Sequence, residues 1–317
     1  MATAIDITIE SPLPEKRTGV VTWPSAAWRF AKRKPMGAIG GFIILLMVIA
    51  ALFVDARIFG SDEPLLALTH YNEQNFGDEN QGMSWEHPLG TDRLGRDMYS
   101  RILYGARVSI VVGLITVFLV GVVSLLIGTP SGYYGSWFDT GIQRIVDALL
   151  AIPAIVLILF GLSVFAPTSG PYPTIAWIIV FLVIIIAAAT IRVVRSAAIT
   201  VSTNQYVDAA RALGGTDLRI MLRHVVPNVI PVVIVLSTLQ LGAVILAEAS
   251  ISFLGYGVRD PFPSWGAMLN RNATADFRAF PMQALWPGLA IALAVWGFNM
   301  FGDALRDVLD PRLRGGR

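Results

Sequence analysis

The sequence contains no cysteine and few charged residues, since Asp, Glu, Lys and Arg together make up only 15% of its 317 positions. The absence of cysteine excludes disulfides, thiolate metal sites and a cysteine nucleophile. The scarcity of charge excludes a soluble globular domain with an ordinary surface, because 55% of the residues are hydrophobic and the mean hydropathy is +0.63. The composition therefore predicts a polytopic membrane protein.

Lysine is also rare, and its rarity bears on nucleotide binding. The chain has only Lys16, Lys32 and Lys34, and none of them follows the glycine-rich loop that cradles phosphates in Walker-type sites. The three histidines are scattered along the chain and form no metal-ligating pattern. We therefore expect no catalytic residue, no metal site, no bound cofactor and no nucleic-acid partner for this chain.

Six runs of the sequence are apolar and nearly free of charge, and each is long enough to cross about 30 Å of hydrocarbon as a helix. An even number of spans returns both chain ends to one side of the membrane. Basic residues are concentrated before the first run and after the last one, so the positive-inside rule places both ends in the cytoplasm. The runs cover approximately residues 37–54, 108–130, 148–166, 174–191, 225–247 and 279–302.

This pattern predicts an all-α protein with six transmembrane helices. The expected parts are a cytoplasmic N-terminal segment (1–36), a first span (37–54), an external loop (55–107), a core of five spans (108–303) and a cytoplasmic tail (304–317). Residues 61–82 of the external loop are rich in polar and turn-forming residues and indicate no fold of their own. The segment 250–280 is too polar to span and too apolar for a plain loop, which favours a helix in the outer interface.

A polar segment at 204–224, between the fourth and fifth runs, predicts two short helices joined by a turn. Asn204 is placed to cap the first helix. Gly214 and Gly215 are placed to end it, because glycine adopts the left-handed conformation that a helix C-terminus needs. Thr216 or Asp217 is placed to cap the second helix. Because spans flank this segment on both sides, we expect it to lie at one membrane face.

The first of these short helices presents small and charged residues. Ala209 and Ala210 allow another surface to approach the backbone closely. Asp208 and Arg211 are three positions apart and therefore share a helix face. We expect a partner to dock on this helix.

The segment resembles the coupling motif of ABC importer permeases, which consists of Glu-Ala-Ala, three residues, Gly, nine residues, Ile, any residue and Leu-Pro. Here Asp208-Ala-Ala, Gly214 and Pro227 fall at the matching positions. Asp208 replaces Glu, which keeps the sign of the charge and shortens its reach. His224 and Val226 replace Ile and Leu, as in the variant of the dipeptide/oligopeptide branch that these residues resemble.

Further motifs resemble the same branch along most of the chain. They are His87-Pro-Leu-Gly-Thr-Asp-Arg-Leu-Gly-Arg-Asp before the second run, Leu246-Ala-Glu-Ala-Ser-Ile-Ser-Phe-Leu-Gly, Pro263-Ser-Trp-Gly, and Gly302-Asp-Ala-Leu-Arg-Asp. The resemblance implies the type I ABC importer permease fold, in the plasma membrane of a prokaryote, which is the inner membrane of a Gram-negative cell. It indicates the permease subunit with the shorter external loop.

The resemblance also implies partners. They would be a second permease subunit, two ATP-binding subunits and an external solute-binding protein, in addition to membrane lipid. ATP and Mg²⁺ would be bound by the ATP-binding subunits, so this chain would be a transport subunit and not an enzyme. The transported solute would be a dipeptide or oligopeptide, with nickel or another small solute as the alternative. Contact with an ATPase would involve Tyr206, Asp208, Ala209, Ala210, Arg211, Gly214 and Gly215.

Other interpretations stay open at this point. An ion-coupled secondary transporter is opposed by the near absence of ionisable groups within the spans. A membrane-embedded structural protein would show no substrate-dependent activity. Glu248 is the one acid near the end of the fifth run. It has either a structural role near the outer interface, where a carboxylate costs little, or a contact with the solute in the translocation path.

Overall fold

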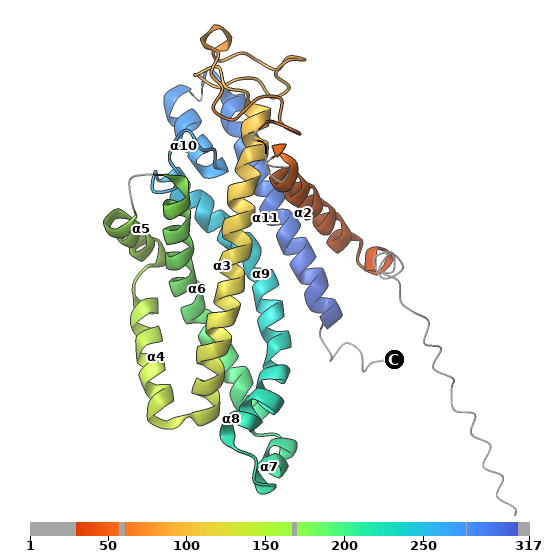
Figure 1. Cartoon of the computed structure of the whole chain (residues 1–317), viewed down its shortest axis with the longest axis vertical. Helices are drawn as coiled ribbons and strands as arrows, with labels where there is room; N and C mark the ends of the chain where they lie inside the picture. The colour runs from red at the N-terminus through yellow and green to blue at the C-terminus, as the bar shows by residue number, and fades with distance from the viewer. Residues whose placement is uncertain (1–29, 57–60, 62, 167–169, 277, 310–317) are drawn as a thin grey trace, which may run out of the picture.

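The structure is a computed structural model and describes residues 30–56, 61, 63–166, 170–276 and 278–309. The regular elements in these ranges are helices, and the longest of them run side by side (Figure 1). Among the described residues, five helices are long and apolar enough to cross a membrane, and α4 with α5 makes a sixth crossing if the two count as one bent span. The helices concerned are α2 (Pro35–Phe53), α3 (Met98–Tyr134), α4 (Ser136–Ala151), α5 (Ala154–Phe165), α6 (Pro171–Ser202), α9 (Val226–Phe253) and α11 (Pro281–Leu309).

The third apolar run differs from its prediction. We expected one helix across 148–166, but α4 ends at Ala151, α5 begins at Ala154, and their axes are bent by 89°. Pro153 explains the break, because proline has no N–H to donate and its ring clashes with the preceding helical turn. Ile152 accordingly takes the extended conformation that a residue before proline prefers, with φ −94° and ψ 133°.

Two helices extend beyond the apolar runs that predicted them. The apolar run of the second span begins at residue 108, whereas α3 begins at Met98, within the segment assigned to the external loop. Its start is set by Asp97, whose side chain accepts a hydrogen bond from the backbone N–H of Ser100 at 2.7 Å. Likewise α11 continues to Leu309, past the expected boundary at 303. Hydropathy detects the apolar part of a helix, whereas capping decides where the helix begins.

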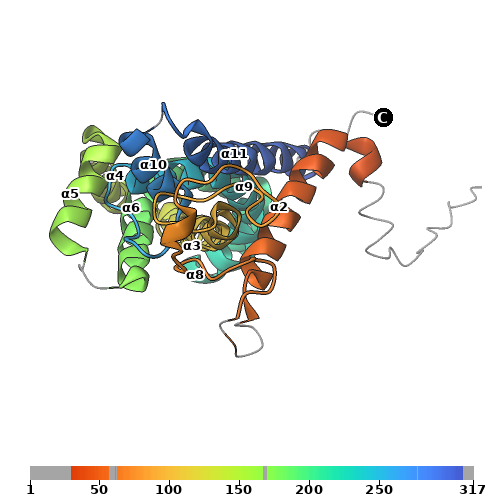
Figure 2. The same ribbon diagram turned by 90° about the horizontal axis from the view of Figure 1, so that it is seen from above.

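Helix α3 lies at the centre of the bundle, with α6 and α9 beside it (Figure 2). Close approach between α3 and α6 depends on small residues. A Cβ atom added to Gly132 of α3 would lie 2.5 Å from the backbone oxygen of Arg195 in α6. Small residues at such crossings let helix backbones pack by van der Waals contact, which is the main source of helix association in a bilayer.

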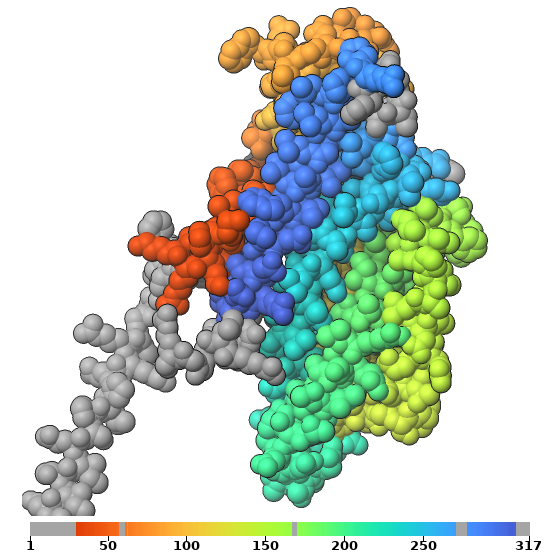
Figure 3. Space-filling view, turned by 180° about the vertical axis from the view of Figure 1, so that it is seen from behind, coloured from red at the N-terminus to blue at the C-terminus, as the bar shows by residue number. Residues whose placement is uncertain are grey.

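The two ends of the described chain meet on one side of the bundle. Helix α2 packs along α11, as the space-filling view shows (Figure 3). At their ends, Lys34 Nζ donates a hydrogen bond to Asp307 Oδ2 at 2.5 Å. The first and last spans therefore place the chain ends on the same side, as an even number of spans requires.

The connection between α2 and α3 folds over the opposite end of the bundle (Figure 1). Beyond residues 61–82, for which no fold was predicted, the end of this loop is tied to the rest of the molecule by ion pairs with buried members. Arg96 Nε donates to Asp92 Oδ2 at 2.7 Å, and its Nη1 lies 3.3 Å from Asp260, in the connection after α9. Arg101 Nη2 lies 3.6 Å from the same Asp260 carboxylate. The side chains of Asp92, Arg96 and Arg101 are at most 4% exposed, so this cluster has little contact with solvent.

Helix α10 (Trp265–Asp276) packs at this end against α9 and α11, and it accounts for the helix expected within 250–280. At Gly266 the backbone of α10 lies very close to the backbone of α9, because a Cβ atom added to Gly266 would lie 2.1 Å from the backbone oxygen of Ala249 in α9. We expect Gly266→Ala to destabilise the protein by about 1–3 kcal/mol, the usual cost of overpacking. Thermal unfolding in detergent measures this.

The matched control for this prediction is Gly288→Ala in α11. An added Cβ there would meet its nearest atom only at 3.9 Å. Alanine also favours helix over glycine by about 1 kcal/mol, so this variant is expected to be at least as stable as the wild type. Equal unfolding temperatures for Gly266→Ala and the wild type would contradict the packing of α10 on α9.

Candidate coupling site

Two short helices project from the end of the bundle that lies farthest from the folded loop (Figure 1). They are α7 (Gln205–Ala212) and α8 (Asp217–Ile220). The predicted helix–turn–helix is therefore present, but the second helix is not a separate element. It continues through a π-helical turn, Met221–Val225, directly into α9. The fifth span thus begins at residue 217 instead of 225, so α8 is continuous with that span.

The turn between the two short helices depends on glycine. Gly214 has φ +81°, a left-handed conformation that side chains other than glycine adopt only with strain. The backbone N–H of Gly215 donates to the backbone oxygen of Ala210 at 3.1 Å. The backbone N–H of Gly214 donates to the backbone oxygen of Arg211 at 3.0 Å. This pair of bonds is the Schellman motif, which satisfies carbonyl groups left free at the end of α7.

Asn204 occupies the N-cap position of α7, but its side chain makes no cap hydrogen bond there. Its amide instead donates to the backbone oxygens of Thr200 and Val201, at 3.4 and 3.0 Å. These carbonyl groups belong to the last turn of α6, where helix geometry leaves acceptors unpaired. The prediction that the Asn204 side chain caps the N-terminus of α7 is therefore wrong. Its side chain instead caps the C-terminal end of α6.

The surface of this turn includes an apolar residue that the sequence motif does not contain. Leu213 is 89% exposed, and Tyr206 on the same short helix is 45% exposed. Val207 between them is completely buried and holds α7 against the bundle. The charged residue Asp208 is exposed as well. The sequence analysis did not single out Leu213, although a large leucine in an otherwise polar segment is a signal that could have indicated it.

The candidate coupling residues are connected to the end of α3. Asp208 and Arg211 form the predicted pair, with Arg211 Nη1 3.1 Å from Asp208 Oδ1. The guanidinium carbon of Arg211 lies 6.0 Å from the centre of the Tyr133 ring, within the range of a cation–π contact. The Tyr133 hydroxyl in turn donates to Asp217 Oδ1 at 2.8 Å. These contacts join both short helices to α3.

A second group of contacts links α4 to α6 and α3 near the same end. Arg195 of α6 donates through Nε and Nη2 to the two carboxylate oxygens of Asp139 in α4, each at 2.5 Å. The hydroxyl of Ser131 in α3 donates to Asp139 at 2.6 Å. Further along α4, Asp147 pairs with Arg192 of α6. These contacts hold α4 against α6 and α3.

Glu248 lies far from this surface, near the other end of α9. Its side chain is completely buried. The hydroxyl of Ser252, one turn further along α9, donates to one carboxyl oxygen at 2.8 Å, and the hydroxyl of Ser109 in α3 donates to the other at 3.3 Å. Because the side chain has no exposed surface, the geometry favours a role in joining α9 to α3 over contact with a solute.

We expect Glu248→Gln to retain near-normal uptake, because the amide is nearly isosteric and its oxygen still accepts a hydrogen bond. Glu248→Ala is expected to cost about 2–4 kcal/mol, since it creates a cavity and leaves two hydroxyl groups without their acceptor. Uptake assays and thermal unfolding distinguish the two variants. Complete loss of uptake by Glu248→Gln at normal protein levels would assign the carboxyl group to the translocation path.

Comparison with known proteins identifies the family to which these features belong. Residues 124–315, which include α7 to α11, match the family described as binding-protein-dependent transport system inner membrane component. Residues 23–82 match the N-terminal transmembrane domain of oligopeptide transport permease C. The chain is 38% identical over 288 residues to the glutathione transport system permease protein GsiD of Escherichia coli, covering 91% of this chain and 90% of that protein. Identity and coverage are the same for the GsiD protein of Shigella boydii.

These matches confirm the family that the coupling motif and the other quoted motifs predict. They cover both the first span and the bundle that carries α7. The chain therefore belongs to the binding-protein-dependent transport system inner membrane components, and it is a multi-pass inner-membrane permease subunit of an ABC importer.

Proposed function

We propose that the solute imported through this permease is a short peptide. The observation that carries the proposal is the similarity, over nearly the whole chain, to permeases named for the transport of glutathione, which is itself a tripeptide. The match of residues 23–82 to a domain of oligopeptide permeases supports the same substrate class. Nickel or another small solute, carried by the same machinery, is the alternative that the experiment below includes.

The proposed complex contains a second permease subunit, two ATP-binding subunits and an external solute-binding protein. ATP and Mg²⁺ bind to the ATP-binding subunits, and this chain contributes no catalytic group. The end that carries α7 faces the cytoplasm, in agreement with the bases near both chain ends. The folded loop between α2 and α3 then faces the solute-binding protein.

In this proposal α7 inserts into a groove of an ATP-binding subunit. Leu213 and Tyr206 supply exposed apolar surface for the centre of the contact, and Asp208 with Arg211 supplies a polar rim. The two helices that flank α7 and α8 carry the movement, since α6 ends at Ser202 and α8 is continuous with α9. Closure of the ATP-binding subunits on ATP then switches the pathway from inward-open to outward-open.

The proposal is tested with the purified complex. The detergent-solubilised chain is expected to capture its ATP-binding subunits, and the complex in proteoliposomes is expected to take up labelled trialanine only when ATP is supplied on the ATPase side. Unlabelled glutathione and Ni²⁺ are then added as competitors. Competition by Ni²⁺ alone would replace the peptide with a metal ion as the solute, whereas uptake driven by an ion gradient without ATP would contradict the coupling mechanism.

A further inference from the structure

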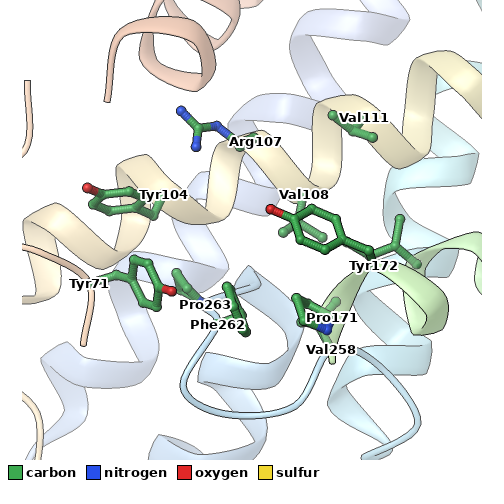
Figure 4. A pocket seen from close by; sticks show the side chains of 11 residues that line it. Tyr71, Tyr104, Arg107, Val108, Val111, Pro171, Tyr172, Val258, Phe262 and Pro263 are labelled. Atoms are coloured by element: carbon green, nitrogen blue, oxygen red, sulfur yellow. The ribbon is translucent and has the colours of Figure 1, made fainter. Parts of the chain in front are cut away.

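An apolar pocket of about 140 Å³ lies near the end of the bundle opposite α7 (Figure 4). Three separate parts of the chain form most of its wall. Helix α3 contributes Tyr104, Val108 and Val111, the first turn of α6 contributes Tyr172, and the connection between α9 and α10 contributes Phe262. The pocket therefore exists only when these three parts are packed together.

The size and lining of the pocket define the group that fits it. A protein cavity of about 150 Å³ with apolar walls stays dry and binds benzene, so this pocket has room for one ring or one branched aliphatic group. Its aromatic side chains already contact each other at angles typical of ring packing. Tyr71 lies 5.0 Å from Tyr104 and 5.3 Å from Phe262, measured between ring centres. A further ring would meet aromatic faces and edges of the kind that stabilise such contacts.

Among the described residues of the wall, Arg107 is the one charged side chain, and it is already paired, which favours a neutral group in the pocket. Arg107 lines the pocket, but its Nη2 and Nη1 donate to the two oxygens of Asp55 at 2.8 and 3.1 Å. Its Nε donates to the backbone oxygen of Ala51 at 2.9 Å. Figure 4 shows the guanidinium group turned away from Phe262. An anionic group in the pocket would have to compete with Asp55, whose side chain is fully buried, for this guanidinium, which makes binding of a carboxylate less favourable.

The pocket opens on an exposed apolar face of α3. Val111 is 38% exposed and Tyr172 is 69% exposed, so the entrance lies between them. Leu114 and Phe118 follow Val111 at helical spacing and are also exposed. They line a second apolar hollow, of about 410 Å³, between α3 and α9. The two apolar hollows therefore follow each other along α3.

We infer that the pocket receives a neutral aromatic or branched aliphatic side chain of the peptide during its entry. The inference rests on the proposed peptide substrate and names a site on the permease for one part of it. A peptide combines such side chains with a polar backbone, which remains at the open edge of the pocket. The permease itself then adds a preference for apolar residues to the selectivity of the solute-binding protein.

The test compares two labelled peptides, trialanine and Ala-Phe-Ala, in proteoliposomes that contain the complete transporter and the same solute-binding protein throughout. Val111→Trp places a large ring at the entrance, and we expect it to lower uptake of Ala-Phe-Ala relative to trialanine by about tenfold, the usual effect of a lost apolar subsite. Ile115→Trp is the matched control, because Ile115 is 43% exposed on the same helix and lies outside this pocket. It is expected to leave the ratio of the two uptake rates unchanged.

A second variant, Tyr172→Ala, removes part of the wall at an exposed position where no loss of folding is expected. It should lower the same ratio by a few-fold. If the ratio of Ala-Phe-Ala uptake to trialanine uptake is unchanged in both variants, the inference about the pocket is overturned. Normal uptake of trialanine in the same experiment would still support the proposed peptide substrate. Equal loss of both peptides in Val111→Trp also overturns it, because it indicates a pocket filled by lipid or by the second permease subunit. Absence of uptake of either peptide by the wild-type transporter contradicts the proposed substrate class, and with it this inference.

Discussion

Replacement of Gly214 by aspartate is expected to leave the protein folded and inserted but to lower ATP-driven uptake by about tenfold or more, since an unpaired charge would be buried in the proposed ATPase contact. The structure explains why the fold survives. An added Cβ at Gly214 would meet no atom within 4 Å, so no side chain has to move. The remaining cost is the left-handed conformation, about 1–2 kcal/mol for a residue other than glycine.

Gly214→Asn is the control that separates the effect of the added charge from the effect of the added side-chain volume. Asparagine has nearly the same size as aspartate and tolerates the left-handed conformation, so this variant keeps the turn and adds no charge. We expect it to capture the ATP-binding subunits and to retain most of the uptake, whereas Gly214→Asp loses both. Capture and uptake at wild-type levels for Gly214→Asp, at equal protein levels, would exclude this turn from the ATPase contact.

The largest expected effect on stability is that of Arg96→Met. Arg96 is the closest cation to Asp92 and also faces Asp260, and its side chain is 4% exposed. Removing it takes from Asp92, whose side chain is 3% exposed, the guanidinium at 2.6 Å, and takes from Asp260 one of its cationic neighbours. Loss of one member of a buried ion pair costs about 3–5 kcal/mol, because the remaining charge stays buried without compensation. We expect a strongly lowered unfolding temperature in detergent and rapid proteolysis of the loop between α2 and α3.

Lys34→Met is the matched control for that prediction. It breaks the pair between Lys34 and Asp307, whose side chains are 40% and 45% exposed. An exposed pair contributes about 0–1 kcal/mol, since water and salt screen it, and this variant is expected to unfold close to the wild-type temperature. Similar unfolding temperatures for Arg96→Met and Lys34→Met would show that the loop is not held by the buried cluster.

The amino-acid sequence by itself determined the membrane character, the family and the position of the candidate coupling site. Apolar runs long enough to cross a bilayer have few alternatives to a helix, because backbone groups in hydrocarbon must pair within the segment. The turn at Gly214 was predictable for a similar reason, since its left-handed conformation is local and favours glycine. The pair of Asp208 with Arg211 depends only on helical spacing, and it too is present.

The tertiary structure alone decided features that depend on neighbours distant in sequence. Pro231 remains inside α9, whereas Pro153 separates α4 from α5, although both residues lack the same N–H group. The missing N–H is the same in both places, so the proline itself does not decide between a continuous and a broken helix, and packed membrane helices can tolerate a proline in their interior. The burial of Glu248 likewise depends on Ser109 of another helix.

The apolar pocket and the folded loop follow the same rule. The pocket wall is contributed by α3, α6 and the connection after α9, and the loop is held by Asp260 of that same connection. No local pattern in the sequence specifies that these segments meet, because hydropathy and spacing describe one helix at a time. Leu213 shows this limit most directly, because the sequence places a leucine beside the turn, but only the structure shows that Val207 is buried while Leu213 is 89% exposed.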